Sequence, residues 1–550
     1  MASVAMSGLT SGVDTAAIVK QLVAVEQQSV TRLQTRQAAI QDKNSAFTTL
    51  ESRIASLKTA VEDIRYASDL RAYKVSSSDA SIVTATAASN ASEGTHEIVI
   101  NRLASAERKV QSGLAALDTL VGTGTFAYTY NGQTRTIQTT GTTTLEGLRD
   151  LINNDGGNPG ITASVLKYGT GDQAYHLVLS GNDTGADYAI TIEDAQTTLD
   201  AFKAAAFTVT QTAQDSRIQV DGYPSGDNWI ERSGNTLTDV LAGVTLELHT
   251  TTPDPAKPVR VSLTRDTEGL KDKLTALATA YNGVVDYAKS QTAYNTATKV
   301  AGVLIGEYSV TSVLAKLRTP LVERATGFAA AEDKYSLAAQ IGLSVDSKGK
   351  LKLDGEVFDK AISDNYLGVL SLVGANRTGT SNSDNLRFYG ARDTTTAGTY
   401  DVRAVFADGV LTSASIKLAG EPESAWRAAT IDGNLIIGAE GKPEQNLQIT
   451  GSYTGSGTAT AQVRVRQGVA GSLYDAIDKV VEDTIDRSQK RFDDQNTRMQ
   501  ANIDKEQARV DRYSVTLAAQ YARLEQALTL LQSQRGALSS LISTSSSSSS

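Results

Sequence analysis

Apolar residues recur at seven-residue intervals in the first part of the chain. The segment from about Thr15 to Ile64 contains no Gly or Pro and is rich in Gln, Ala, Glu and Arg, a composition that favours a helix. One apolar position repeats every seventh residue and a second follows it by three: Leu33, Ile40, Phe47, Ile54 and Val61 form the first set, and Leu50, Leu57 and Ile64 form the second. Arg36 and Lys43 hold the earlier positions of the second set, so the stripe is weak before Leu50. This spacing predicts a coiled-coil helix.

The other end of the chain repeats the pattern. From Ser472 to Ile542 only Gly536 interrupts the helical composition, and no Pro occurs. The seven-residue repeat and its adjoining position are occupied by Ile503, Val510, Leu517, Leu524, Leu531 and Leu538, and by Tyr521 and Leu528. The stretch Arg487–Arg512 has few apolar residues and needs packing partners to be stable. We expect these partners to be the N-terminal helix and equivalent helices of other copies; a solvated helix packed on one domain is the alternative.

Between the two helical ends, alternating apolar and polar residues indicate half-exposed strands. HEIVINRL (His96–Leu103) and YHLVLS (Tyr175–Ser180) are examples, separated by Gly, Asn and Asp turns. Helical spacing returns in Glu268–Ala297, and the turn DSKGK (Asp346–Lys350) indicates a hairpin. The chain is strand-rich again from about Ala375 to Arg466.

These segments predict an α+β multidomain protein, in which N- and C-terminal coiled-coil helices form a leg and β-rich head domains are inserted between them. The predicted division is an N-terminal segment and coiled-coil helix at residues 1–68, β-rich head domains at 69–265, a helical domain with a β-hairpin at 266–374, an inserted all-β domain at 375–468, a C-terminal coiled-coil helix at 469–543 and a disordered Ser tail at 544–550.

Composition narrows the classes of function. The net charge of -9, from 61 acidic and 52 basic residues, gives no reason to expect nucleic acid or an anionic membrane as a partner. The absence of Cys excludes disulfides, a thiolate nucleophile and Cys-ligated zinc. No stretch is apolar enough to cross a bilayer, and the start MASVAMSGLTSGVD lacks the basic and apolar regions of a secretory signal. Export by the general secretion route is therefore not expected.

Candidate chemistry is sparse. No P-loop, nucleophile elbow, His-Glu-x-x-His or dinucleotide motif occurs. The pairs Glu193–Asp194 and Asp493–Asp494 are more typical of solvated surface than of acid/base catalysis. The loops Asn153–Gly160 and Ser180–Tyr188 offer oxygen ligands for calcium without EF-hand spacing, so plain turns are favoured. We expect no enzymatic activity, no catalytic residues, no cofactor and no metal site.

Several stretches together resemble the flagellar filament cap protein family, also called flagellar hook-associated protein 2. The opening SGLTSGVDTAAIVKQLVAVEQQSV (Ser7–Val30) is similar to that family's start, and LEGLRDLINNDGGNPGITASVL (Leu145–Leu166) is similar to the Ile-Asn motif of flagellins and hook-associated proteins. The other similar stretches are Ile218–Leu248, Thr275–Tyr287, Ala301–Arg318, Ile341–Asp354 and Tyr521–Ile542. The resemblance covers most of the chain except about Ala375–Arg466.

The resemblance implies a secreted, extracellular protein at the distal tip of the bacterial flagellum, exported by the flagellar type III apparatus. Members of that family form a ring-shaped homo-oligomer that promotes the folding and polymerisation of exported flagellin and prevents its loss. The partners implied are flagellin, hook-filament junction proteins and, before secretion, an export chaperone, with no nucleic acid and no membrane. Some relatives also act in adhesion. The alternatives are another flagellar axial protein, such as the junction protein or flagellin, and a surface adhesin.

Overall fold

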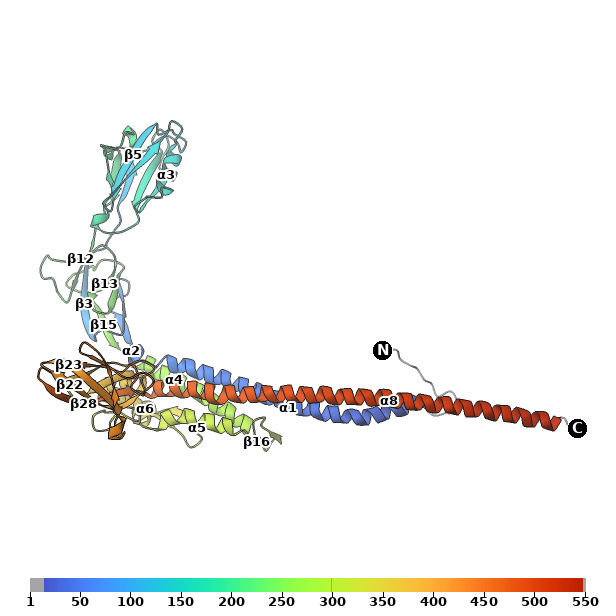
Figure 1. The fold of residues 1–550 in the computed structure, drawn as a ribbon. Helices are drawn as coiled ribbons and strands as arrows, with labels where there is room; N and C mark the ends of the chain where they lie inside the picture. The colour runs from blue at the N-terminus through green and yellow to red at the C-terminus, as the bar shows by residue number, and fades with distance from the viewer. Residues whose placement is uncertain (1–13, 298, 548–550) are drawn as a thin grey trace. The chain divides into compact units, whose positions relative to one another are not determined.

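The computed structural model describes residues 14–297 and 299–547, and the chain forms two compact units (Figure 1). One unit joins the residues up to Ala67 with those from Lys271 onward, and the other is Ser68–Leu270. The first seven residues of the opening stretch Ser7–Val30 lie outside the described residues. Asp14 is described, and its side chain accepts a hydrogen bond from the N–H of Ala17. Asp14 thereby caps the first helix in the manner that Asp favours.

The first unit contains the helices at both ends of the chain. They are α1 (Thr15–Glu62), α7 (Val469–Val480) and α8 (Asp486–Ser547), with one π-helical turn, η6 (Val481–Ile485), joining α7 to α8. The helix α8 thus includes residues 544–547, which the sequence placed in a disordered tail. Ser and Thr have only modestly lower helix propensities than Ala, so a long helix can propagate into such a run.

Three further helices pack against these ends within the first unit. They are α4 (Thr267–Thr292), α5 (Tyr308–Val322) and α6 (Gly355–Gly374), accompanied by η4 (Ala338–Ile341), the short pair β16 (Tyr294–Asn295) and β17 (Val300–Ala301), and the hairpin β18 (Leu343–Val345) and β19 (Leu351–Leu353). Asn365 interrupts α6 with an extended backbone, and its Oδ1 accepts the N–H of Gly368, so it caps the second half of that helix.

A β domain of two packed sheets is inserted between α6 and α7. One sheet has the order β20 (Asn376–Ser381), β28 (Gly457–Gln467), β22 (Gly398–Ala407), β23 (Val410–Leu418), β24 (Arg427–Ala428), and the other β21 (Leu386–Gly390), β27 (Gln448–Gly451), β26 (Leu435–Ile437), β25 (Thr430–Asp432). The turn η5 is Glu423–Ala425. Because Asn376 of the first strand pairs with Gln467 of the last, the chain enters and leaves this domain at adjacent points.

The second unit holds two separate hydrophobic cores. The first lies between the sheet β1 (Tyr73–Ser77), β15 (Val259–Arg265), β3 (Gly94–Arg102), β11 (Ser216–Val220), β12 (Ile230–Arg232) and the sheet β13 (Thr236–Leu241), β14 (Val244–Leu248), β2 (Val83–Ala87). The short helix α2 (Ala67–Leu70) precedes β1. Since β3 and β11 are neighbours, everything between them is a second insertion.

That second insertion forms the other core. Its sheets are β10 (Phe207–Gln211), β4 (Arg108–Gln111), β8 (Tyr175–Gly181), β7 (Ile161–Lys167), and β6 (Gln133–Thr139), β5 (Gly124–Tyr130), β9 (Thr191–Ile192), with α3 (Leu145–Asn153) and the turns η1 (Ala186–Tyr188), η2 (Asp200–Phe202) and η3 (Ala204–Ala206). Thr144 accepts the N–H of Gly147 and caps α3, which buries Leu148 and Ile152. Terminal helices with β-rich domains between them confirm the predicted fold class.

Candidate functional site: the paired terminal helices

The helices α1 and α8 lie side by side and run in opposite directions (Figure 1). Thr15 near the start of α1 donates a hydrogen bond to Glu525 near the end of α8, at 2.5 Å. Asn44, further along α1, donates to Asp493, which is earlier in α8, at 2.8 Å. The two ends of the chain therefore meet in one antiparallel pair, formed within a single copy.

The predicted stripe residues divide into three groups by burial. Those fully or almost fully buried are Phe47, Leu50, Ile54, Leu57, Val61, Ile64, Ile503, Val510 and Leu517. Those partly buried are Leu33, Ile40, Tyr521 and Leu528. Leu524, Leu531 and Leu538 are 51%, 60% and 60% exposed. In α8, the heptad repeat is thus one continuous pattern. Its first residues pack inside the chain, and its last residues are exposed.

A polar belt separates two apolar contacts along the pair. On one side Val30 packs with Ile503 and Val510, and on the other Phe47 packs with Phe492. The polar belt consists of side-chain hydrogen bonds between the two helices: Gln37 to Gln500 at 2.8 Å, Gln41 to Asn496 at 3.3 Å and Asn44 to Asp493 at 2.8 Å. Ser29 bonds to Glu506 at 2.6 Å beside the Val30 contact. Such polar pairs fix register at a cost in stability. The sequence showed the polar residues but not that they pair.

Lys43, predicted to weaken the stripe, bonds outside it. Its ammonium lies 2.8 Å from Glu307, a residue just before α5, and Arg491 of α8 reaches the same carboxylate at 2.7 Å. Burial raises the pKa of Glu307, but hydrogen bonds from Lys43 and Arg491 outweigh it and hold the pKa below its usual value. Glu307 therefore connects both terminal helices to α5 through charge. Arg36 is exposed.

A second carboxylate holds the outer part of the pair. Arg509 and Ser29 hydrogen-bond to Glu506 and lower its pKa to about 2. Arg509 also reaches Glu26 across the pair, at 2.5 Å. Glu506 is ionised at neutral pH and connects α8 to α1.

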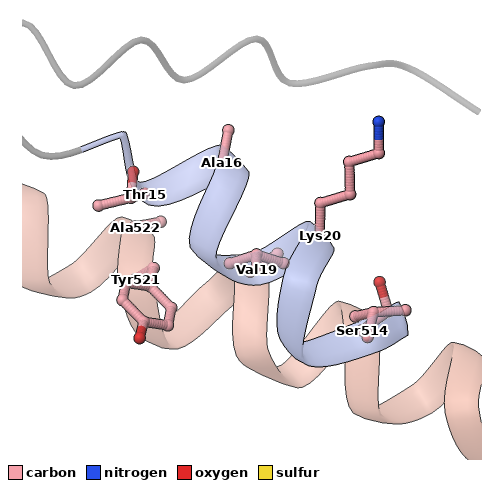
Figure 2. A pocket seen from close by; sticks show the side chains of 9 residues that line it. Thr15, Ala16, Val19, Lys20, Ser514, Tyr521 and Ala522 are labelled. Atoms are coloured by element: carbon pink, nitrogen blue, oxygen red, sulfur yellow. The ribbon is translucent and has the colours of Figure 1, made fainter. Parts of the chain in front are cut away.

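A groove lies where α1 begins (Figure 2). It has a volume of about 400 Å³, and its lining residues are Thr15, Ala16, Val19, Lys20 and Val23 of α1 with Ser514, Ala518, Tyr521 and Ala522 of α8. Small side chains from both helices leave this space open, and Figure 2 shows Thr15 beside Ala522 and Tyr521. Grooves of this kind between two helices accept the side chains of a third helix.

The composition of α8 changes along its length. Charged residues are frequent in Asp486–Arg512, whereas Leu524–Ser547 contains only Glu525 and Arg535 as charged residues. Thr15 opposite Glu525 is the first residue of α1, so α8 continues past it (Figure 1). The exposed Leu530, Leu531 and Leu538 lie in this continuation. A neutral, Leu-rich helix surface is typical of a protein interface.

The polar loops considered for calcium use their side chains internally. Asp155 receives two hydrogen bonds from Arg135, at 2.8 and 2.6 Å, and Asn158 bonds to the main chain of Ile152 and Ile161. Asp183 bonds to Tyr130. Among the described residues, no cluster of His, Asp and Glu is arranged to hold a metal ion.

The acidic pairs and the Trp residues lie in ordinary surface contacts. Asp493 accepts from Asn44, Glu193 accepts from Thr129, and the N–H of Trp426 donates to Glu423. Trp229 is partly buried. In residues 14–297 and 299–547, no helix combines the length and apolarity needed to cross a bilayer.

Terminal helices that pair around inserted β domains define the architecture of a multidomain structural protein. Family models for the C-terminus and the N-terminus of flagellar hook-associated protein 2 match residues 213–533 and 11–107, and a model of the flagellin hook IN motif matches residues 125–183. The chain belongs to the flagellar hook-associated protein 2 family, which contains flagellar cap proteins.

Individual relatives agree with this assignment. The A-type flagellar hook-associated protein 2 of Pseudomonas aeruginosa is 27% identical over 398 residues, covering 67% of this chain and 80% of the relative. The flagellar hook-associated protein 2 of Escherichia coli K12 is 28% identical over 401 residues, covering 68% and 81%. A crystal structure of three domains of the flagellar cap protein FliD from Escherichia coli matches with a TM-score of 0.50 and 28% identity, covering 60% of this chain and 90% of that one.

Proposed function

We propose that this protein caps the distal tip of the bacterial flagellum as a ring-shaped homo-oligomer, promotes the folding and polymerisation of exported flagellin and prevents its loss. The single observation that carries the proposal is the outward-facing Leu stripe at the end of α8, which continues the pattern that pairs α8 with α1. We refer to the α1–α8 pair with this extension as the leg.

The leg is suited to contact other helices. Leu531 and Leu538 are each 60% exposed on a helix segment that has one acidic and one basic residue. Burying the exposed part of each side chain against a partner contributes roughly 25 cal/mol per Å² of apolar surface. The partners of the proposal are terminal helices of hook-filament junction proteins and of flagellin, and the β domains form the remainder of the cap.

The polar belt supports a leg whose contacts can rearrange. Gln37–Gln500 and Gln41–Asn496 are exposed hydrogen bonds, which contribute little net free energy because water replaces them readily. Segments with few buried apolar contacts open at low free-energy cost. A leg that loosens here would exchange contacts as each flagellin subunit enters below the cap.

The proposal places the protein outside the cell. It would leave through the flagellar type III channel, with an export chaperone before secretion, and reach the tip unfolded. A chain without Cys forms no disulfide in either compartment and can refold outside without redox chemistry.

The test is a stripe variant in the strain that makes this protein. Leu531→Asp with Leu538→Asp should abolish filament growth and motility and release unpolymerised flagellin into the medium, because the leg loses its apolar contact. Val515→Asp is the matched control: Val515 is 71% exposed on α8 but lies off the stripe. Normal filaments in the stripe variant, at normal secreted levels, would overturn the proposal.

A further inference from the structure

A groove in the second unit runs between the edge strand β6 and the helix α3. It has a volume of about 440 Å³, and its lining residues are Thr136, Ile137 and Gln138 of β6 with Gly147, Asp150, Leu151, Asn154 and Asp155. The strand β6 pairs with β5 alone, so its other edge faces the groove. A strand edge beside a helix is the arrangement that peptide-binding domains use to add a partner's strand to their sheet.

The main-chain groups that face this groove follow from the register. The carbonyl of Ala127 accepts the N–H of Glu193, and the N–H of Ala127 donates to Thr197, so this residue of β5 points away from β6. The residues on either side of Ala127 in β5 are Phe126 and Tyr128. Their main-chain groups therefore bond to those of their β6 partners, Ile137 and Arg135.

By alternation, the N–H and C=O groups of Thr134, Thr136 and Gln138 point outward from the sheet. In the described part of the chain, no other main-chain group bonds to the N–H or C=O of these three residues. Three residues of β6 thus offer a ladder of donors and acceptors along the groove.

The opposite edge of the same domain is closed. On β7, the side-chain amide of Asn153 bonds to both the N–H and the C=O of Ala163, at 2.8 Å each. Asn158 does the same for Ile161, at 2.8 and 2.7 Å. At the far edge of the sheet that contains β7, β10 carries a bulge between Val209 and Gln211. Side-chain capping and bulges are two of the devices that protect edges from strand addition, and the described residues of β6 show neither.

The charges and apolar side chains of the groove select its occupant. Arg135 neutralises Asp155 through two hydrogen bonds. Arg149 forms ion pairs with both Asp150 and Glu146, at 2.7 and 3.0 Å. One positive charge therefore faces two negative charges, and the α3 side of the groove keeps a net negative charge. Leu151, 41% exposed, gives the helix side an apolar wall. An extended segment with one basic residue and alternating β-branched residues complements this surface.

We propose that this groove binds an extended polypeptide segment of a partner protein, which adds to the sheet as a strand beside β6. The segment bonds through its main chain to Thr134, Thr136 and Gln138, places a Lys or Arg near Asp150 and rests an apolar side chain on Leu151. Binding of such a segment is a function beyond capping, and it can be tested without filament assembly.

The probe is a fluorescent hexapeptide, acetyl-Lys-Thr-Val-Thr-Val-Thr-amide, titrated by polarisation into the purified full-length protein. Strand addition uses only every second N–H of the peptide. N-methylation of the edge-facing set should therefore weaken binding about tenfold or more, whereas methylation of the alternate set should leave it unchanged. Equal effects of both sets, or no binding at millimolar peptide, would overturn the proposal.

A matched pair of variants tests the protein side. Thr136→Pro removes an outward N–H that the β5–β6 ladder does not use, so the strand can keep its pairing. It should weaken the peptide about tenfold. Thr136→Ala keeps that N–H and should bind like the wild type. Undiminished binding to a folded Thr136→Pro protein would exclude this site. Sedimentation showing that copies associate through β6 instead would also overturn it, because the occupant would then be a second copy.

Discussion

The ring of Phe47 in α1 packs on the ring of Phe492 in α8, with centroids 5.6 Å apart and planes inclined by 48°. Both side chains are almost completely buried, at 0% and 2% exposure. This contact joins residues from the two ends of the chain. It lies beside the polar belt and holds α1 against α8 at that end of the belt.

The aromatic contact predicts a large effect of truncation. Phe492→Ala should lower the free energy of unfolding by about 3–5 kcal/mol, because it removes a buried ring and leaves a cavity against Phe47. Denaturant unfolding followed by the helical circular dichroism signal measures it. Phe492→Leu should lose markedly less. A change below about 1 kcal/mol for the Ala variant would mean that the two rings do not pack in solution.

Buried and exposed members of one heptad repeat should respond differently to the same substitution. Val510→Asp places a charge at a position with 1% exposure and should open the outer pair, which raises amide hydrogen exchange around Val30. Leu531→Asp alters a residue with 60% exposure and should leave exchange around Val30 unchanged in the isolated protein. Equal responses of both variants would contradict the pairing of α1 with α8 at this register.

Asn153→Ala should open the edge of β7. The substitution removes both side-chain bonds to Ala163, at a net cost of about 1 kcal/mol since Asn153 is solvent-exposed. Its larger consequence should be association, because an uncapped edge accepts a strand from another molecule. Light scattering during mild heating measures this. Asn154→Ala, at the adjacent exposed residue, is the control and should stay monodisperse.

Acid should loosen the leg. The pKa of Glu506 is about 2 in the folded chain, below the ordinary value of about 4.3. Its bonds to Ser29 and Arg509 therefore stabilise the pair fully above the ordinary pKa, and this contribution is lost as pH falls from there through about 2. Glu307, whose pKa is also lowered, acts in the same direction. The protection factors of the α1 amides, which are the intrinsic exchange rates at each pH divided by the observed ones, should fall over this window, and the fall should be smaller in Glu506→Gln.

Strong local patterns made the fold class predictable. A heptad repeat is a property of consecutive residues, and so is the strand pattern of His96–Leu103, of which all residues but Leu103 lie in β3. The heptad repeat of α8 could not show how far α1, its partner helix, covers it. Leu517 and Leu524 look equivalent in sequence, yet one is 8% and the other 51% exposed, because α1 begins opposite Glu525.

The side-chain pairing lay beyond sequence reasoning. Gln37 and Gln500 are ordinary polar residues in the printed chain, and nothing local marks Glu307 as the carboxylate that Lys43 and Arg491 share. Asn153 stood inside a recognised motif, but its role at the edge of β7 depends on how α3 packs.

The sequence by itself determined the two terminal helices and the strand-rich character of the segments between them, because hydrophobic periodicity and turn residues act over a few neighbours. Only the tertiary structure decided which stripe residues are covered, which polar groups bond across the leg and which strand edges are closed. The coverage of the stripe and the bonds across the leg depend on contacts between residues hundreds of positions apart, and the closed edge of β7 depends on how α3 packs beside it, so all three appear only in the folded chain.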